Sequence, residues 1–260
     1  MRALVGADGV HEWPVAVLSL GDGAPALQPA SPAVAGETHT APLELPLATA
    51  AQRAGESAAL GEAWPSGKPV TLAATDTRPI EEVVLARGSQ RRLDPAGVLP
   101  RSTLETAISV AMRGIQQPHF IAAHAVTGMV PGIYRWPHLD APIRNGDFRG
   151  ELYRVCLDQG LARDGAFVVI GATDVSRLDD AGYREAQLAA GLVEGRLHLA
   201  AYALGASASG MTFLDSEIPA LIGEPLDGLL FTCVGVPEYK SAAGGQPGAP
   251  STIRGMQPRL

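Results

Sequence analysis

Two arginines and a serine lie close together at Arg87, Ser89 and Arg91. Two guanidinium groups and a hydroxyl can surround a phosphate dianion with charge-assisted hydrogen bonds, and the planar guanidinium matches the geometry of a phosphate edge. The spacing therefore allows an anion-binding site. The same residues can also form a solvated basic run beside a linker, and the local pattern alone favours that alternative.

A second candidate segment runs from Ala206 to Gly210 and contains only Ala, Ser and Gly. Main-chain N–H and C=O groups can approach a flat ligand closely where no bulky side chain holds it away. Met211 and Thr212 follow directly and extend the candidate site. An ordinary small-residue loop after a core helix also explains this stretch, and taken alone the stretch favours that reading.

The histidines and cysteines do not form a recognisable ligand pattern. His119 and His124 lie in a predicted strand and are interpreted as strand or core histidines, because a metal site needs a third converging ligand that the sequence does not indicate. Cys156 and Cys233 lie far apart without CxxC or Cys-His spacing. They indicate neither a disulfide framework nor a zinc site, and they favour a reduced cytoplasmic protein.

A long helix must precede the small-residue segment. Ser176, Asp179 or Asp180 can cap its first turn, and Gly205 suits a left-handed C-terminal cap. The helix is therefore expected to run for about 25 residues, or about 38 Å. Apolar or small residues recur at the spacing of one helical face: Leu188, Leu192, Gly195, Leu199 and Tyr202. Because the residues beside this face are also small, we expect another element to pack very close to it.

Other elements follow from continuous apolar runs and capping residues. The run at 166–171 is typical of a central strand that is buried on both faces. The remaining expected elements are a helix starting at Ser102 or Thr103, a strand at 120–126, a helix near 150–163 and a strand at 229–235.

The N-terminal third of the chain differs in composition from the rest. Residues 1–21 combine a helix end at 3–6 with an expected strand at 14–20, and this order resembles 220–235. They are interpreted as the tail of a preceding repeat, with chance similarity as the alternative. Residues 22–80 are rich in Pro, Ala and Gly and are expected to be a linker with a short helix at 47–60. Residues 81–237 are expected to form the main domain, followed by a flexible tail at 238–260.

Composition excludes several classes of protein. The chain of 260 residues is 46% hydrophobic, which is enough for a substantial core. Its formal net charge of -7 and its pI near 5.4 argue against nucleic-acid binding, which needs clustered basic residues. No signal peptide is recognisable, and no apolar run reaches the length of a membrane span.

Several segments, taken in order, resemble the C-terminal half of the nitroreductase superfamily, and in particular its SagB-type dehydrogenase branch. The matching segments are GIYRW at 132–136, CLDQ at 156–159, YR at 183–184, LHLAAYALG at 197–205, F-x-D at 213–215 and LIG at 221–223. The similarity covers about residues 83–237 and rests on the order of several weak motifs. It implies an α+β fold with a mixed sheet flanked by helices and a long central helix.

The resemblance also implies a function and a site. Members bind FMN at a dimer interface and transfer hydride at flavin N5, so a homodimer or a nitroreductase-like partner is expected. Arg87, Ser89 and Arg91 fall on the family positions that hold the FMN phosphate, and the backbone of Gly210, Met211 and Thr212 falls beside the ring. A C-terminal basic residue also reaches the phosphate in the family, and Lys240 and Arg254 are candidates for it.

The SagB-type branch implies a particular kind of substrate. Its members oxidise azoline rings in modified peptides, so a modified peptide or another small molecule is expected as the substrate. Some members use a Lys-Tyr pair to remove a proton. Tyr183 is the candidate catalytic acid or base here, although no Lys lies near it in the sequence. A buried aromatic at the start of a helix is the alternative role for Tyr183.

The chain departs from the family pattern in several flavin-contact segments. In the phosphate motif, Gly88 replaces the second residue and Leu93 replaces the aromatic one. Ile115 stands where the family has an Asn that holds the flavin edge, and the P-S-x-G segment of the SagB branch is not visible. These departures favour an alternative, a degenerate flavin-free binding or scaffold module that pairs with an intact homologue. A nicotinamide enzyme is disfavoured because the Gly-rich run follows a helix instead of opening one, and no G-x-S-x-G elbow indicates a hydrolase.

Overall fold

A computed structural model describes residues 5–14, 45–56, 65–70 and 78–240. The chain divides into two compact units, one formed by Met1–Gly61 with Asp179–Arg184 and the other by Glu62–Leu178 with Glu185–Leu260. The expected strand at 14–20, most of the linker and nearly all of the C-terminal tail, with Arg254, lie outside the described residues.

The first unit contains one described helix of its own, α2 (Pro46–Ala54). Pro46 suits the first helical position because its missing N–H would have no partner there. Near the C-terminal end of α2, the guanidinium of Arg184 donates a hydrogen bond to the carbonyl of Gln52 at 2.6 Å. The short helix expected at 47–60 is therefore confirmed as far as residue 54, and residues 57–60 are not described.

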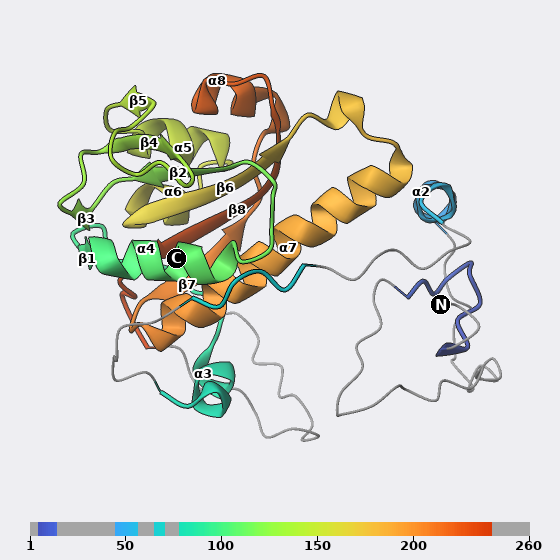
Figure 1. The fold of residues 1–260 in the computed structure, drawn as a ribbon, viewed down its shortest axis with the longest axis horizontal. Helices are drawn as coiled ribbons and strands as arrows, with labels where there is room; N and C mark the ends of the chain where they lie inside the picture. Colours follow the sequence, from blue (N-terminus) through green and yellow to red (C-terminus); the bar gives the residue numbers. More distant parts are fainter. Residues whose placement is uncertain (1–4, 15–44, 57–64, 71–77, 241–260) are drawn as a thin grey trace, which may run out of the picture. The chain divides into compact units, whose positions relative to one another are not determined.

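The second unit is built on a six-stranded sheet in the order β5-β4-β2-β6-β8-β7 (Figure 1), and every neighbouring pair is antiparallel. Its strands are β2 (His119–Ala123), β4 (Gly132–Arg135), β5 (Arg144–Asn145), β6 (Phe167–Thr173), β7 (Ser207–Met211) and β8 (Asp227–Gly235). A separate parallel pair joins β1 (Leu99–Pro100) to β3 (Val126–Thr127). The expected strands at 166–171 and 229–235 are confirmed as β6 and β8.

Helices cover both faces of the sheet in Figure 1, and each face has its own hydrophobic core. On the first face lie α4 (Arg101–Ala111) and the part of α7 (Asp180–Ala203) that belongs to this unit. On the second lie α5 (Arg149–Val155), α6 (Gly160–Asp164) and α8 (Ile218–Ile222). Strand β6 serves both cores, because its side chains alternate between the two faces. The α+β fold expected from the sequence is confirmed, but the main sheet is antiparallel throughout, whereas a mixed sheet was expected.

The remaining described elements connect these layers. They are α3 (Ile80–Ala86) and two short 3₁₀ turns, η1 (Val175–Arg177) and η2 (Asp215–Glu217). No described helix combines the length and hydropathy that a membrane crossing requires.

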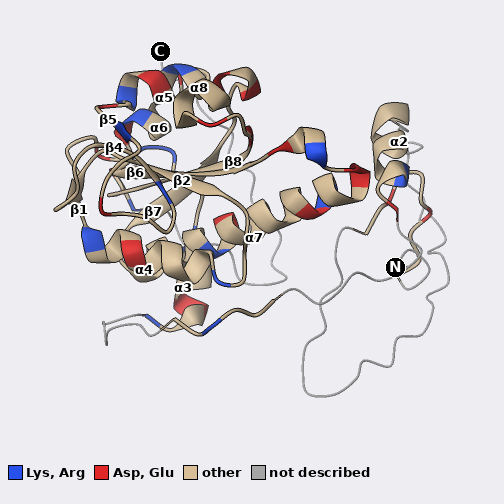
Figure 2. Ribbon diagram, turned by 45° about the horizontal axis from the view of Figure 1, so that its top comes forward, with Lys and Arg blue, Asp and Glu red and all other residues tan. Residues whose placement is uncertain are grey.

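The long helix α7 begins and ends as expected. The carboxylate of Asp179 accepts a hydrogen bond from the N–H of Gly182 at 2.7 Å and caps the first turn. Gly205 follows the last turn with a φ of 80°, in the left-handed region that glycine adopts without strain. The charged residues of α7 carry both signs (Figure 2), as expected for a helix with an exposed face.

The buried face of α7 is shifted from the predicted one. It consists mainly of smaller residues, including Val193, Leu197 and Ala201, which pack on the first face of the sheet. Gly195, which was expected under a close contact, is exposed, and a Cβ added at Gly191 or Gly195 would meet none of the described atoms within 4 Å. The small side chains of Ala and Val let the helix approach the sheet. The sizes of the residues alone therefore did not identify the face of α7 that packs on the sheet.

Three local predictions are wrong. Ala206–Gly210 is not a loop, because β7 spans most of it and pairs with β8. The single helix expected near 150–163 is two helices, separated where Leu157 and Asp158 take positive φ values of 59° and 57°. Helix α4 starts at Arg101 behind Pro100, without a side-chain cap from Ser102 or Thr103.

Candidate functional site

The segment 87–92 lies along the outer edge of β7, the last strand of the sheet. The N–H of Gln90 donates to the carbonyl of Ala208 at 3.2 Å, and the N–H of Asp94 donates to Val236 at 2.9 Å. Gln90 is fully buried and its side-chain amide donates to the carbonyls of Arg92 and Tyr239. These contacts fix the segment against the strand, so the two candidate segments of the sequence lie side by side.

The three predicted phosphate ligands are all exposed at this edge. Arg87 Nη1 lies 3.5 Å from His198 Nδ1 of α7, and Ser89 Oγ lies 3.0 Å from Ser209 Oγ of β7. The backbone N–H of Arg91 donates to the hydroxyl of Tyr239 at 3.3 Å. The arrangement combines guanidinium and hydroxyl donors at the surface, which is the chemistry that an anionic group requires.

The outer edge of β7 also presents main-chain groups. Residues two apart on a strand direct their N–H and C=O groups to the same side. Because the carbonyl of Ala208 accepts a bond from Gln90 outside the sheet, the main-chain groups of Gly210 point to the same outer edge. Thr212 follows the strand and is exposed, whereas the side chain of Met211 is buried in the second core.

A carboxyl group lies directly over Gly210. A Cβ built on Gly210 would overlap Oε1 of Glu194 and come within 3.2 Å of Oε2. Glu194 comes from α7 and its side chain is 24% exposed. Burial raises the pKa of Glu194 above its usual value, since a charged carboxylate is less well solvated there.

His198 follows Glu194 one helical turn later and is buried. Its Nε2 lies 3.6 Å from Glu194 Oε1, beyond hydrogen-bond length, and has no hydrogen-bond partner among the described residues. Burial, with a smaller contribution from the positive charge of Arg87, lowers the pKa of His198 to about 4. The imidazole is therefore neutral at neutral pH.

The contact with Arg87 assigns the tautomer of His198. A guanidinium only donates hydrogen bonds, so Nδ1 of His198 must be the acceptor and Nε2 carries the proton. That N–H group faces the carboxyl group of Glu194. Successive contacts therefore lead from Arg87 to His198, from His198 to Glu194, and from Glu194 to the backbone of Gly210.

A small cavity lies between α7 and the sheet, next to Glu194. It has a volume of about 10 Å³, close to the room needed for one water molecule. Its polar lining comes from His119, Glu194 and Thr232. Nδ1 of His119 donates to the carbonyl of Gln117 at 3.0 Å, which leaves Nε2 as an acceptor, and burial lowers the pKa of this histidine.

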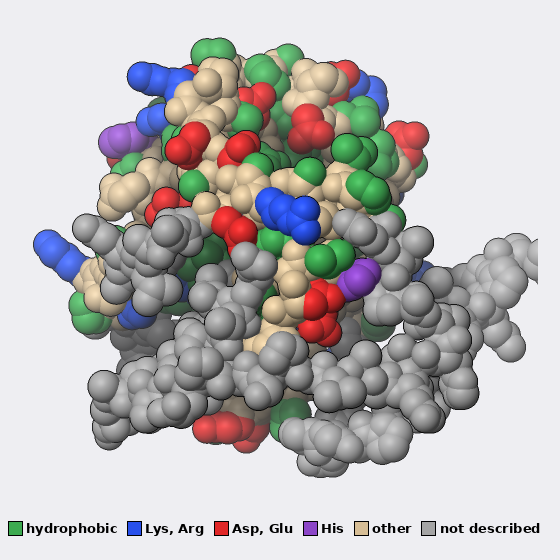
Figure 3. All heavy atoms as spheres, turned by 90° about the vertical axis from the view of Figure 1, so that its right-hand side faces the viewer, with side chains coloured by type: hydrophobic (Ala, Val, Ile, Leu, Met, Phe, Trp, Pro, Cys, Tyr) green, Lys and Arg blue, Asp and Glu red, His purple; other side chains and the backbone are tan. Residues whose placement is uncertain are grey.

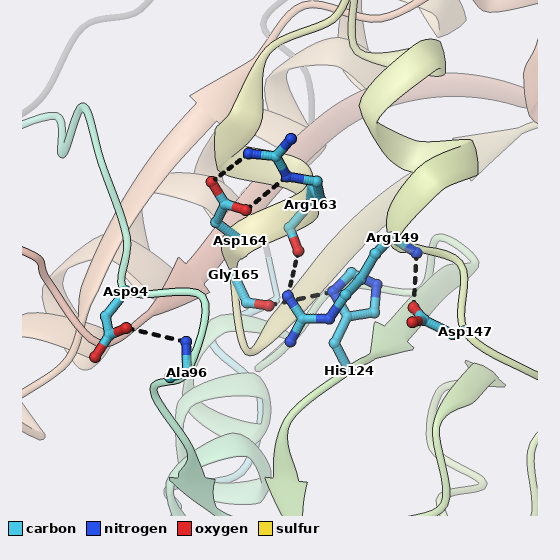
Figure 4. A network of polar contacts seen from close by, with 8 residues as sticks. All are labelled: Asp94, Ala96, His124, Asp147, Arg149, Arg163, Asp164 and Gly165. Carbon is cyan, nitrogen blue, oxygen red and sulfur yellow. Dashed lines mark hydrogen bonds and ion pairs between the residues drawn. The ribbon is translucent and has the colours of Figure 1, made fainter.

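The other predicted histidine, His124, belongs to a separate polar cluster at the opposite end of β2 (Figure 4). Its Nδ1–H donates to the carbonyl of Gly165 at 3.2 Å. Arg149 donates to the carbonyl of Arg163, and Arg163 forms an ion pair with Asp164. Each cation in this cluster has a partner that explains its position, so the cluster supports local structure.

Neither cysteine belongs to the site. Cys156 and Cys233 are free and fully buried in the second core. Burial raises the pKa of Cys156 to about 12, and it also raises the pKa of Cys233. The part of the chain described here contains no group of three residues that could hold a metal ion.

Tyr183, Ile115 and Lys240 are the remaining described residues that the sequence singles out. Tyr183 belongs to the first unit and is 44% exposed, so it is not the buried aromatic that the alternative role requires. Ile115 packs in the first core. Lys240 is exposed and follows Tyr239, whose hydroxyl accepts the bond from Arg91.

Sequence reasoning missed Glu194, His198 and Ser209. The first two stand four residues apart, the spacing that places side chains on one helical face. This spacing is visible in the sequence, but it does not show which face of the helix packs on the sheet. Figure 3 shows acidic and basic side chains intermixed on one face of the molecule, with no continuous patch of either sign among its described residues.

Comparison with known proteins rests on structure alone, because no protein-family model and no curated protein matches the sequence. A candidate nitroreductase from Anabaena variabilis matches with a TM-score of 0.56 and 26% identity, over 61% of this chain and 38% of that one. This chain thus spans well under half of that protein.

Two further structures match over most of their own length. A candidate NAD(P)H:FMN oxidoreductase from Staphylococcus epidermidis has a TM-score of 0.50 and 12% identity, over 69% of this chain and 95% of that one. A candidate nitroreductase from Exiguobacterium sibiricum, solved in complex with FMN, has the same TM-score and identity, over 68% and 95%. The sheet of this chain, with helices on both faces, therefore has the nitroreductase-like fold that its motifs predict.

Proposed function

We propose that the chain is an FMN-dependent oxidoreductase of the nitroreductase type. The observation that carries the proposal is the position of Arg87 and Ser89 beside the outer edge of β7, where Gly210 directs its main-chain groups outward. Anion donors therefore lie next to outward main-chain groups of a glycine, as a flat ligand with a phosphate requires. The FMN-bound Exiguobacterium sibiricum protein has the same fold and makes FMN the natural ligand to test.

The residues fit the chemistry of FMN. The guanidinium groups of Arg87 and Arg91 and the hydroxyl of Ser89 would hold the phosphate through charge-assisted hydrogen bonds. The backbone of Gly210, Met211 and Thr212 would lie beside the ring, with the outward main-chain groups of Gly210 as hydrogen-bond partners. A Cβ at Gly210 would meet the carboxyl group of Glu194, so glycine suits the position.

FMN, when bound, supplies hydride transfer, and the protein contributes binding and orientation. The edge of β7 would orient the ring, and the basic segment would fix the phosphate end. Within the family, a SagB-type reaction would oxidise azoline rings in a modified peptide, with Tyr183 as an acid or base. We propose this narrower activity on the sequence motifs, together with a homodimer or a nitroreductase-like partner and a cytoplasmic location.

The first test is the visible absorbance spectrum of the purified protein before and after incubation with FMN and removal of free flavin. We expect flavin bands in the wild-type protein. An Arg87→Ala, Arg91→Ala double variant should bind FMN at least about a hundredfold more weakly, because hydrogen bonds to charged groups each contribute about 1.5–3 kcal/mol. Riboflavin, which lacks the phosphate, should bind equally well to both proteins.

The matched control is Arg177→Ala, which removes an exposed arginine from η1. It should bind FMN as the wild-type protein does. A folded wild-type protein that acquires no flavin would contradict the proposed enzyme. That outcome would favour the flavin-free binding module, which the apolar burial of Ile115 at the expected Asn position also supports.

A further inference from the structure

The carboxyl group of Glu194 lies over Gly210, on the face of β7 that α7 covers. Its Oε1 and Oε2 both lie against Gly210, and its carboxyl group also lines the small cavity with His119 and Thr232. Its 24% exposure leaves a path to solvent. A titratable group therefore lies at the backbone position where the ring of a bound flavin is proposed to sit.

The neighbours of Glu194 include both donors and apolar residues. The Nε2–H of His198 faces Oε1 at 3.6 Å and can shorten to a hydrogen bond by a small side-chain shift. Arg87 holds the other ring nitrogen of His198, so the donor stays oriented toward the carboxyl group. On the other side, Ala190, Val193 and Leu230 line the cavity and withhold solvation from the carboxylate.

We propose that Glu194 is the group that carries a proton at this site, and that His198 and Arg87 orient it. The inference rests on the proposed FMN-dependent function and adds an acid–base residue to it. A substrate that accepts a hydride becomes negatively charged and needs a proton to become neutral. Glu194 can supply that proton, or accept one in the opposite direction.

The proton step balances with groups on this chain and water. The O–H bond of the protonated carboxyl group breaks, and the proton moves to the substrate atom that carries the negative charge left by the hydride. The carboxylate that remains accepts a hydrogen bond from the Nε2–H of His198, which does not change its own protonation. Water then returns a proton to Glu194 through its exposed side, and the site is restored.

Other charged or titratable groups near Glu194 come from three further elements. Arg87 of the 87–92 segment acts through His198, and His119 of β2 lines the same cavity. The carboxylate also acts on Cys233 of β8. Burial raises the pKa of this thiol most, and Cys156 and then Glu194 raise it further. The thiol and the imidazole of His119 are uncharged at neutral pH, so the charge of Glu194 itself dominates the local change with pH.

The experiment measures FMN dissociation constants by quenching of flavin fluorescence from about pH 5 to about pH 8 in the wild-type protein and in Glu194→Gln. The amide is isosteric and uncharged, so it mimics the protonated acid. A carboxylate repels the FMN phosphate and the electron-rich edge of the ring. The ratio of the wild-type to the variant constant should therefore rise with pH, by up to about tenfold per pH unit.

In the ratio of the two dissociation constants, the effect of the titration of the FMN phosphate cancels, because it is common to both proteins. Glu185→Gln is the control, because Glu185 is exposed on the same helix, and its ratio should stay flat. His198→Ala removes a donor to the carboxylate and should raise the pH at which the wild-type ratio begins to change, whereas a purely structural role would shift the dissociation constants equally at all pH values.

A wild-type to Glu194→Gln ratio that does not change with pH, in proteins that bind FMN, would overturn the role of Glu194 alone. A wild-type protein that binds no FMN would instead overturn the proposed function, and this inference with it.

Discussion

The carboxyl group of Glu194 on α7 lies over the backbone of Gly210 on β7, so close that a Cβ at Gly210 would be 3.0 Å from the carboxyl carbon. This relationship joins a helix and an edge strand that the sequence separates only by a turn. It places an ionisable group on the edge that we assign to a flavin, and it makes Gly210 a sensitive position.

Gly210→Ala should change ligand binding far more than stability. The added methyl group meets the flexible end of Glu194, which can move toward solvent, so the free energy of unfolding should change by less than about 1 kcal/mol. FMN affinity should fall because the carboxyl group and the methyl group both crowd the edge. Urea denaturation and flavin titration measure the two effects.

Gly228→Ala on β8 is the control for this substitution. There a Cβ would lie 2.7 Å from the ring of Phe213 and 2.9 Å from Ile218, which is fully buried. Overpacking of this kind should cost about 1–3 kcal/mol. If Gly210→Ala destabilises the protein as much as Gly228→Ala does, Glu194 is held rigidly and the site is not adaptable.

Gly195→Ala should report on the exposed face of α7. A Cβ there meets none of the described atoms within 4 Å, and alanine favours a helix interior by about 0.8–1.0 kcal/mol over glycine. If the face is open to solvent, the melting temperature should rise by several degrees.

A fall in the melting temperature of Gly195→Ala would have to be interpreted together with the oligomeric state. If a second copy of the chain packs closely on Gly195, the same substitution should lower the melting temperature and weaken the dimer in size-exclusion chromatography. Gly191→Ala, on the same face, should behave in the same way in either case.

Acid should destabilise the protein through His124. Burial, and then the positive charge of Arg149, lowers the pKa of His124 to about 4, whereas an unfolded histidine has a pKa near about 6.5. Between these values the unfolded state binds more protons, so the free energy of unfolding falls as pH falls, by up to about 3 kcal/mol for this group.

His124→Asn keeps a donor for the carbonyl of Gly165 and removes the titration. The variant should lose less stability than the wild-type protein between about pH 7 and about pH 5 in urea denaturation. His138→Asn changes an exposed histidine and should leave the wild-type slope intact. Equal slopes in the His124 variant and the wild-type protein would show that His124 does not contribute.

Both cysteines should resist alkylation in the native protein. The thiolate is the reactive form, and burial holds the pKa of Cys156 near about 12 and raises that of Cys233. Mass spectrometry after iodoacetamide treatment at neutral pH should show no native label and two labels after unfolding. Rapid native labelling of either thiol would mean that the second core opens readily.

The sequence by itself was sufficient for the elements whose signals are local. Helix α7 has a capping carboxylate at Asp179 and a left-handed glycine at Gly205, and both act through bonds within a few residues. Strand β6 is a continuous apolar run, which is typical of a strand buried on both faces. The α+β fold was predicted from the resemblance of several weak motifs, taken in order, to the nitroreductase superfamily.

Tertiary structure decided the features that depend on distant partners. Ala206–Gly210 has no strand propensity of its own, and most of it becomes β7 because β8 satisfies its hydrogen bonds. The break between α5 and α6 requires left-handed residues at Leu157 and Asp158, which the sequence does not signal. The meeting of Arg87 with His198 joins residues 111 positions apart. Such a contact follows from how α7 and the 87–92 segment pack on one sheet, so it exists only in the folded chain.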